Sequence, residues 1–148
     1  MFDILFIHPW ERVNLAPERP SLIAALVDKY VDIPQKWVLH VACISDEEMR
    51  TLNHTYRQKD STTDVLSFHY FDDFSWLKKD EVAGEIVLSE SCIIAQADEH
   101  GHSIDRETEI LILHGVLHIL GFDHETDWDY EIMWSYESIM RENLLLTK

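Results

Sequence analysis

Residues 110–124 decide how the rest of the chain is interpreted, and they read Ile-Leu-Ile-Leu-His-Gly-Val-Leu-His-Ile-Leu-Gly-Phe-Asp-His. The first half is apolar and contains no proline, so it predicts a largely buried helix. His114 and His118 are four residues apart and therefore share one helical face. Gly121 can take a left-handed conformation, which ends a helix and lets the chain turn back. We expect this turn to bring His124 towards the other two imidazoles.

Three neutral imidazoles with one position left for water make a catalytic site for one Zn²⁺ ion, and other divalent transition metals suit the same donors. The alternatives are core or surface histidines, or a structural metal. Structural zinc usually has four protein ligands, often thiolates, whereas Cys43 and Cys92 are distant in sequence and flanked by apolar residues. Asp123 either holds a ligand imidazole in place or is only a turn residue. Because ligation needs neutral imidazoles, activity should fall below a pH of about 6.5.

The same stretch is similar to the long zincin signature, His-Glu-x-x-His-x-x-Gly-x-x-His. Its three histidines and Gly121 match this signature position for position. Gly115 stands where the signature has glutamate, the general base that activates water in those proteases. The pattern therefore indicates metal-assisted chemistry that lacks the usual base for peptide hydrolysis.

The composition is that of a globular protein, with 46% apolar and 27% charged residues among 148. We expect one domain, residues 1–148, that is large enough to bury a core. The N-terminus shows no basic segment followed by an apolar run, and no run of about 18 apolar residues occurs, so neither a signal peptide nor a membrane span is expected. Two cysteines without a disulfide framework favour a reducing compartment, so we expect a cytoplasmic protein.

The net charge of −16 opposes any interpretation as a nucleic-acid-binding protein, because such a protein normally shows a basic face. Residues 81–148 hold 15 acidic and 3 basic side chains, whereas residues 1–80 hold 13 and 9. An anionic substrate must therefore meet local cations, chiefly in the first half, or the metal itself.

The pattern of apolar residues and breakers predicts an α/β (α+β) fold. Strands are expected at 2–8, 37–44, 63–70 and 84–88, and helices at 21–30, 45–56, 89–99, from about 103 to Gly121, and at 128–144. This order favours a single domain in which about five helices pack on a small mixed four-stranded β-sheet.

Residues 52–68 form a second informative segment, Leu-Asn-His-Thr-Tyr-Arg-Gln-Lys-Asp-Ser-Thr-Thr-Asp-Val-Leu-Ser-Phe. It places Arg57 and Lys59 on a loop between a predicted helix and a predicted strand. Arginine binds phosphate through two parallel hydrogen bonds, so this loop is a candidate phosphate-binding site. The alternative is a solvated, charged turn.

Taken together, the two segments resemble the YbeY family of bacterial metal-dependent endoribonucleases. The family motif Asn-x-x-Tyr-Arg-x-Lys-Asp-x-x-Thr-Asp-Val-Leu-Ser-Phe is present at residues 53–68, and His-Gly-x-Leu-His-x-x-Gly-(Tyr or Phe)-Asp-His is present at 114–124. Met133 and Glu137 fit the family's final helix, and the resemblance spans roughly residues 45–140. His69 departs from the family, many members of which have proline there.

The resemblance implies a metal-dependent hydrolase domain that cleaves single-stranded RNA. It implies maturation of ribosomal RNA, especially at the 3′ end of the 16S rRNA, and ribosome quality control. His114, His118 and His124 would be zinc ligands, Arg57 a catalytic residue that also binds the RNA, and Lys59 a further RNA contact. The implied partners are single-stranded RNA and ribosomal RNA, with small-subunit ribosomal proteins or a ribosome-associated GTPase, and not DNA or a membrane.

Two other interpretations come from different classes of protein. A metalloprotease is supported by the zincin spacing and opposed by Gly115. A non-catalytic, zinc-stabilised ribosome-associated factor is supported by the acidic composition, which suits a protein partner better than naked RNA.

Overall fold

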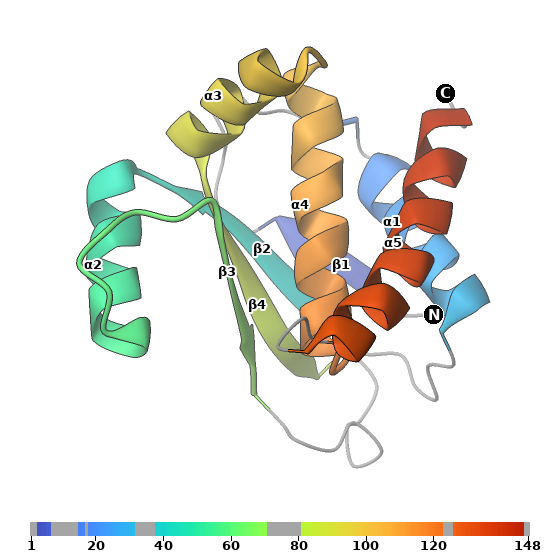
Figure 1. The fold of residues 1–148 in the computed structure, drawn as a ribbon, viewed down its shortest axis with the longest axis horizontal. Coiled ribbons are helices and arrows are strands. Elements are labelled where there is room, and N and C mark those ends of the chain that lie inside the picture. The colour runs from blue at the N-terminus through green and yellow to red at the C-terminus, as the bar shows by residue number, and fades with distance from the viewer. Residues whose placement is uncertain are drawn as a thin grey trace.

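The order of strands and helices agrees with the sequence prediction (Figure 1). The computed structural model describes residues 3–6, 15–16, 18–31, 38–70, 81–122 and 126–146. Within these residues the elements are β1 (Asp3–Phe6), α1 (Glu18–Tyr30), β2 (Val38–Ile44), α2 (Asp46–Arg57), β3 (Val65–His69), β4 (Val82–Ser89), α3 (Glu90–His100), α4 (Ile104–Ile119) and α5 (Asp127–Leu146). The described part of the chain therefore has the predicted α+β architecture.

The four strands form one mixed sheet in the order β1-β2-β4-β3. β2 pairs in parallel with β1 and β4, whereas β3 runs antiparallel to β4. Alternate residues of β4 face opposite sides, so Ile86 joins the main core and Val87 joins a smaller cluster with Met49 and Leu66. In Figure 1, α4, α5 and α1 lie on one side of the sheet and α2 lies apart from them, beyond β3.

Helix α4 is the central element and is buried along nearly its whole length, as its apolar sequence predicts. It lies so close to β4 that a Cβ atom at Gly115 would meet the Ile86 side chain at 3.0–3.2 Å. Glycine at this position therefore has a packing role. Neither α4 nor any other helix in the described residues is both long and apolar enough to cross a membrane.

The helix ends follow local sequence signals. Ser45, Ser89 and Ser103 cap α2, α3 and α4, since each side-chain oxygen accepts a hydrogen bond from a backbone N–H three residues later. Gly121 has a φ of 102° and turns the chain after α4, as predicted. Helix α1 begins three residues earlier than expected, because Pro20 lies in its first turn, where proline costs no helical hydrogen bond.

A buried ion pair joins the three helices on the main core. Arg19 on α1 donates to both carboxylate oxygens of Glu109 on α4, at 2.6 and 2.7 Å, and to the carbonyl oxygen of Leu144 on α5, at 3.0 Å. The Glu109 side chain is only 5% exposed, and its hydrogen bonds raise the pKa of Arg19. This contact fixes α1 and α5 against the N-terminal half of α4.

Candidate functional site

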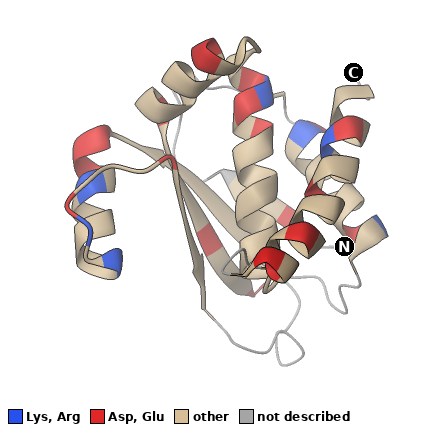
Figure 2. Cartoon of the chain, in the orientation of Figure 1, with Lys and Arg blue, Asp and Glu red and all other residues tan. Residues whose placement is uncertain are grey.

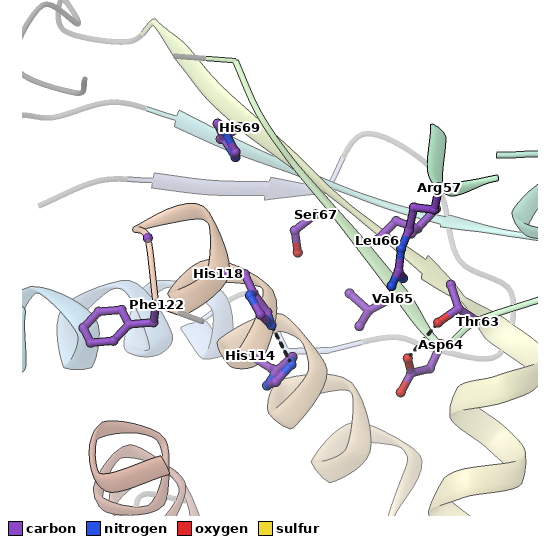
Figure 3. Close-up of a pocket in the computed structure, with 11 residues that line it drawn as sticks. Arg57, Thr63, Asp64, Val65, Leu66, Ser67, His69, His114, His118 and Phe122 are labelled. Carbon is purple, nitrogen blue, oxygen red and sulfur yellow. Dashed lines mark hydrogen bonds between the residues drawn. The ribbon is translucent and has the colours of Figure 1, made fainter. Parts of the chain in front are cut away.

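His114 and His118 lie one turn apart near the C-terminal end of α4 and turn their rings towards each other (Figure 3). Their Nε2 atoms are 3.1 Å apart, and the ring planes meet at 78°. Two imidazoles bound to one zinc at about 2.0–2.1 Å in tetrahedral geometry place their nitrogens about 3.3 Å apart. The observed pair therefore matches the separation that one ion requires.

A carboxylate from α5 stands behind this pair. Glu137 Oε1 lies 3.3 Å from His114 Nδ1, and the Glu137 side chain is 7% exposed. A partner on Nδ1 directs the other ring nitrogen, Nε2, towards a metal and fixes its tautomer. Arg141 Nη2 lies 3.7 Å from the same carboxylate oxygen. Sequence reasoning placed Glu137 on the last helix but gave it no role.

A cavity of about 640 Å³ opens beside the two imidazoles, between α4 and β3. Residues of three segments line it: Arg57 at the end of α2, residues 63–67 and His69 on and before β3, and His114, His118, Gly121 and Phe122 on and after α4. Figure 3 shows Val65 and Ser67 of β3 on the side of the strand that faces the histidine pair. The two sequence motifs, about 50 residues apart, thus meet at one pocket.

The conformation of the loop that follows Arg57 is fixed by local contacts. Gln58 ends α2 in the left-handed conformation, with a φ of 59°, so the chain reverses directly after Arg57. The buried Asn53 side chain donates to the carbonyl oxygen of Ser61 at 2.8 Å. Lys59 is exposed on this loop and is not among the residues that line the cavity. Its predicted contact with substrate stays a prediction.

Asp64 supplies a carboxylate to the cavity wall. Its Oδ2 accepts a hydrogen bond from Gln96 Nε2 at 3.2 Å, and its Oδ1 accepts one from the Thr63 hydroxyl at 3.4 Å. These contacts fix the carboxylate in place. Asp64 belongs to the family motif at 53–68, but the sequence gave no role to it or to its partner Gln96, because the two are 32 residues apart and meet only in the fold. His69, which departs from the family pattern, also lines the cavity.

Charged residues are unevenly spread along the helices (Figure 2). Helix α2 begins with acidic residues and ends with Arg57, which lines the cavity, whereas α5 begins with Asp127 and Asp129. An anion in the cavity would therefore meet a cation at the C-terminal end of α2. The predicted ligand His124 and the neighbouring Asp123 lie outside the described residues.

The cysteines are free and half-buried. Burial, with a smaller contribution from Glu90, raises the pKa of the Cys43 thiol to about 12. A protonated thiol is a poor metal ligand. Cys43 therefore does not offer a thiolate at neutral pH.

The sequence model of the family described as Endoribonuclease YbeY matches residues 14–144. The chain belongs to the YbeY family. It is 37% identical over 124 residues to a relative named Endoribonuclease YbeY from Roseiflexus castenholzii. This alignment covers 76% of this chain and 78% of that relative. A relative of the same name from Aquifex aeolicus is 46% identical over 87 residues, which span 59% of this chain but only 56% of that relative's length.

The fold recurs in a solved structure. A solution structure of a protein from Thermotoga maritima aligns over 97% of this chain and 89% of that one, with a TM-score of 0.60 and 24% sequence identity. At this identity the likeness concerns the fold. It supports the mixed four-stranded sheet and five helices described here for this YbeY-family chain.

The described part of the chain also brings together His100, His102 and Glu107, whose possible ligand atoms all lie within 4.8 Å of one another. This group lies at the N-terminal end of α4, away from the cavity, and none of its members lines that cavity. In the sequence, Gly101 between the two histidines favours a helix stop over a metal site. Gly101 between them does cap α3 in the left-handed conformation, with a φ of 69°.

Proposed function

We propose that this YbeY-family chain is a metal-dependent endoribonuclease, a hydrolase that cuts single-stranded RNA. One observation carries the proposal: two imidazoles with Nε2 atoms 3.1 Å apart share a cavity with Arg57. Neutral imidazoles are good donors for Zn²⁺ and for other divalent transition metals. With His124, the pair would supply the three ligands of a zinc ion, which polarises a phosphoryl oxygen when it is bound.

The chain's own residues have separate roles in this proposal. Arg57 holds a phosphate of the RNA through paired hydrogen bonds and offsets charge that develops during cleavage. Asp64, held by Gln96 and Thr63, is placed to accept a proton at the cavity wall. Glu137 keeps the His114 ring oriented through Nδ1. Asp123 would hold a ligand imidazole in the same way, and Lys59 would bind the RNA backbone beyond the cavity.

The biological substrate in this proposal is ribosomal RNA. The family motifs support maturation of the 3′ end of the 16S rRNA and ribosome quality control in the cytoplasm. A net charge of −16 suppresses binding to arbitrary nucleic acid. Small-subunit ribosomal proteins or a ribosome-associated GTPase would therefore help to bring the RNA to the cavity.

The packing of Gly115 opposes a metalloprotease. The zincin general base would have to occupy this position, where even a Cβ atom meets Ile86 at 3.0–3.2 Å. Ile86 is fully buried in the sheet and has little room to move. The alternative with support of its own is a non-catalytic, zinc-stabilised ribosome-associated factor, which the acidic composition favours.

Cleavage of a labelled single-stranded RNA tests the proposal. Wild type, His118→Ala and the control His54→Ala, an exposed histidine on α2 outside the cavity, are purified identically. Wild type and His54→Ala should cut, a chelator should stop them, zinc should restore them, and His118→Ala should be inert. Equal cutting by all three proteins would point to a contaminating nuclease. No cutting by any folded protein would favour the ribosome-associated factor, and cutting of casein would favour the protease.

A further inference from the structure

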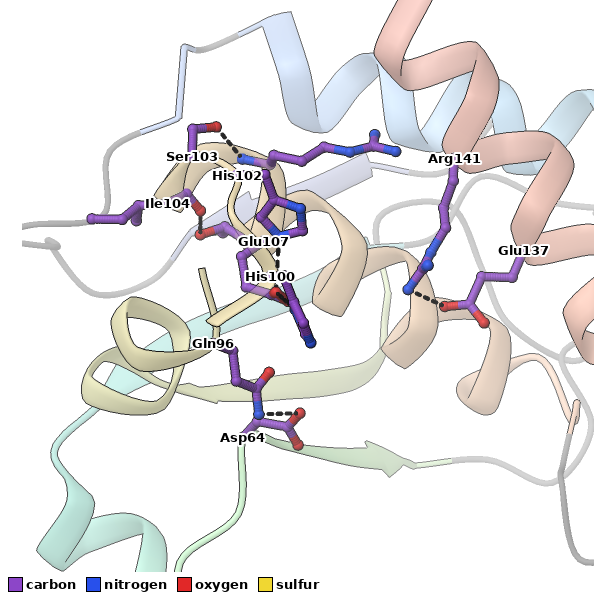
Figure 4. A network of polar contacts seen from close by, with 11 residues as sticks. Asp64, Gln96, His100, His102, Ser103, Ile104, Glu107, Glu137 and Arg141 are labelled. Carbon is purple, nitrogen blue, oxygen red and sulfur yellow. Dashed lines mark hydrogen bonds and ion pairs between the residues drawn. The ribbon is translucent and has the colours of Figure 1, made fainter. Parts of the chain in front are cut away.

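The junction between α3 and α4 gathers three metal-binding side chains from 8 residues of sequence, 100–107 (Figure 4). Glu107 Oε1 lies 2.7 Å from His100 Nδ1 and 2.9 Å from His102 Nε2. The left-handed Gly101 turns the chain so that the two imidazoles, with centroids 5.5 Å apart, reach the same carboxylate oxygen. Ser103 then starts α4, whose first turns present Glu107 to both rings.

The carboxylate of this group is buried, whereas its imidazoles reach solvent. The Glu107 side chain is 2% exposed, against 52% for His100 and 28% for His102. Across the described residues, the side-chain partners of Glu107 are these two imidazoles, which carry a charge only when protonated. A buried carboxylate needs a compensating cation or several hydrogen bonds. An ion that enters from the solvent side can supply this charge without any change in the backbone.

We propose that His100, His102 and Glu107 form a second metal site, for a divalent transition metal of the zinc class. Two imidazoles and one carboxylate are an established zinc donor set, and water completes the coordination. Their donor atoms all lie within 4.8 Å of one another. Ligands of one zinc lie about 3.3 Å apart, so each exposed ring has to move outward from the carboxylate oxygen by about half an ångström, while donor atoms that are further apart approach one another.

This second site is separate from the proposed catalytic one. Glu107 and His114 lie on the same face of α4, but seven residues correspond to about 10 Å along a helix. Paired catalytic metals lie about 4 Å apart, so the two ions would not act on one phosphate. The second ion instead clamps α3 to α4. Helix α3 also carries Gln96, which holds Asp64 at the cavity wall, so the clamp supports that wall.

Metal stoichiometry tests this site independently of RNA cleavage, and hence of the proposed function. Metal-free protein is titrated with Zn²⁺ by calorimetry, and with Co²⁺ by absorption. Wild type should bind two ions per chain. His100→Ala/His102→Ala and, separately, His114→Ala/His118→Ala should each bind one. The control His54→Ala should still bind two. Unchanged stoichiometry in His100→Ala/His102→Ala would overturn the proposal, as would loss of all binding in a folded His114→Ala/His118→Ala variant.

Chemical footprinting of the wild type tests the second site even if a double variant fails to fold. Diethylpyrocarbonate modifies exposed imidazoles, and mass spectrometry reports the rate at each histidine. Zinc should slow modification of His100 and His102 in wild type but not in Glu107→Gln, where the anionic ligand is lost. His54 should react at the same rate with and without zinc. Equal rates at His100 and His102 with and without excess zinc would overturn the second site.

Discussion

Each end of helix α4 lies beside a group of two histidines and one glutamate, and the two groups are arranged in opposite ways. At the C-terminal end, Glu137 stands behind His114, and the His114 and His118 Nε2 atoms point towards each other beside the cavity. At the N-terminal end, Glu107 stands in the middle, and both imidazoles point at it. The first arrangement presents nitrogen donors to a substrate pocket, whereas the second turns them towards a buried carboxylate at the junction of α3 and α4.

The helix dipole adds to this difference. A cation is favoured near the C-terminus of a helix and disfavoured near the N-terminus. The histidine pair therefore offers a better electrostatic environment for a metal than the N-terminal group, where the charge of Glu107 must offset the dipole. We therefore expect changes at the C-terminal end to weaken the tighter metal site, and changes at the N-terminal end to remove the weaker site and to lower stability.

The largest stability effect should come from the ion pair at the N-terminal half of α4. Arg19→Met leaves the Glu109 carboxylate buried without its partner, so we expect a loss of about 3 kcal/mol in the free energy of unfolding. Urea denaturation measures it. Arg19→Met/Glu109→Leu should recover most of this loss, since an apolar pair replaces the charges. Weaker zinc binding by His114 and His118 in folded Arg19→Met would show that the two ends of α4 are energetically coupled, which would contradict our inference that they act independently.

Glu137→Gln tests the C-terminal end. The amide is a weaker partner for His114 Nδ1, so we expect zinc affinity to fall about 10–100-fold, with little change in stability. Calorimetric titration measures the affinity. Glu142→Gln, at an exposed position on the same helix, is the matched control. If Glu137→Gln and Glu142→Gln bind zinc with equal affinity, Glu137 acts only in packing and does not orient His114 for metal binding.

Gly115→Ala examines how closely α4 must approach β4. The added methyl group would crowd three atoms of Ile86 at 3.0–3.2 Å. Overpacking costs about 1–3 kcal/mol, and alanine returns up to about 1 kcal/mol in helix propensity, so we expect a net loss of about 1 kcal/mol. Ile86→Val should cost less in the Gly115→Ala background than alone, because it relieves the crowding. Additive losses from the two changes, measured by thermal unfolding, would contradict this account of Gly115.

Local signals in the sequence were sufficient to predict most of the helices and strands. Ser103 and Gly121 mark the two ends of α4 because capping depends on residues within one turn. The role of Glu137 was not predictable, since it depends on how α5 packs across α4, 23 residues further along the chain. Likewise, the sequence shows that Gly115 replaces a glutamate, but only the contact with Ile86 explains why glycine is required there.

The smallest effect concerns the attachment of α2, which carries Arg57, to the end of β4. Hydrogen bonds from Ser91 and Ser89 lower the pKa of Asp46, and the Ser89 hydroxyl lies 2.8 Å from its carboxylate. A lowered folded-state pKa stabilises the protein above the unfolded value of about 3.9, and this contribution is lost as the pH falls through the folded value.

Asp46→Asn should therefore lower stability at pH 7 by less than about 1 kcal/mol, because Asp46 is largely exposed to solvent. The difference from wild type should shrink as the pH falls below about 3.9 and through the lowered folded-state pKa, as the wild-type carboxylate takes up a proton. Glu47→Gln removes a charge from the same helical turn and measures the dipole effect alone. Urea unfolding at pH 7 and at a series of acidic pH values gives the comparison. If Asp46→Asn also weakened zinc binding at either end of α4, α2 would be coupled to those sites, and the two ends would not be independent.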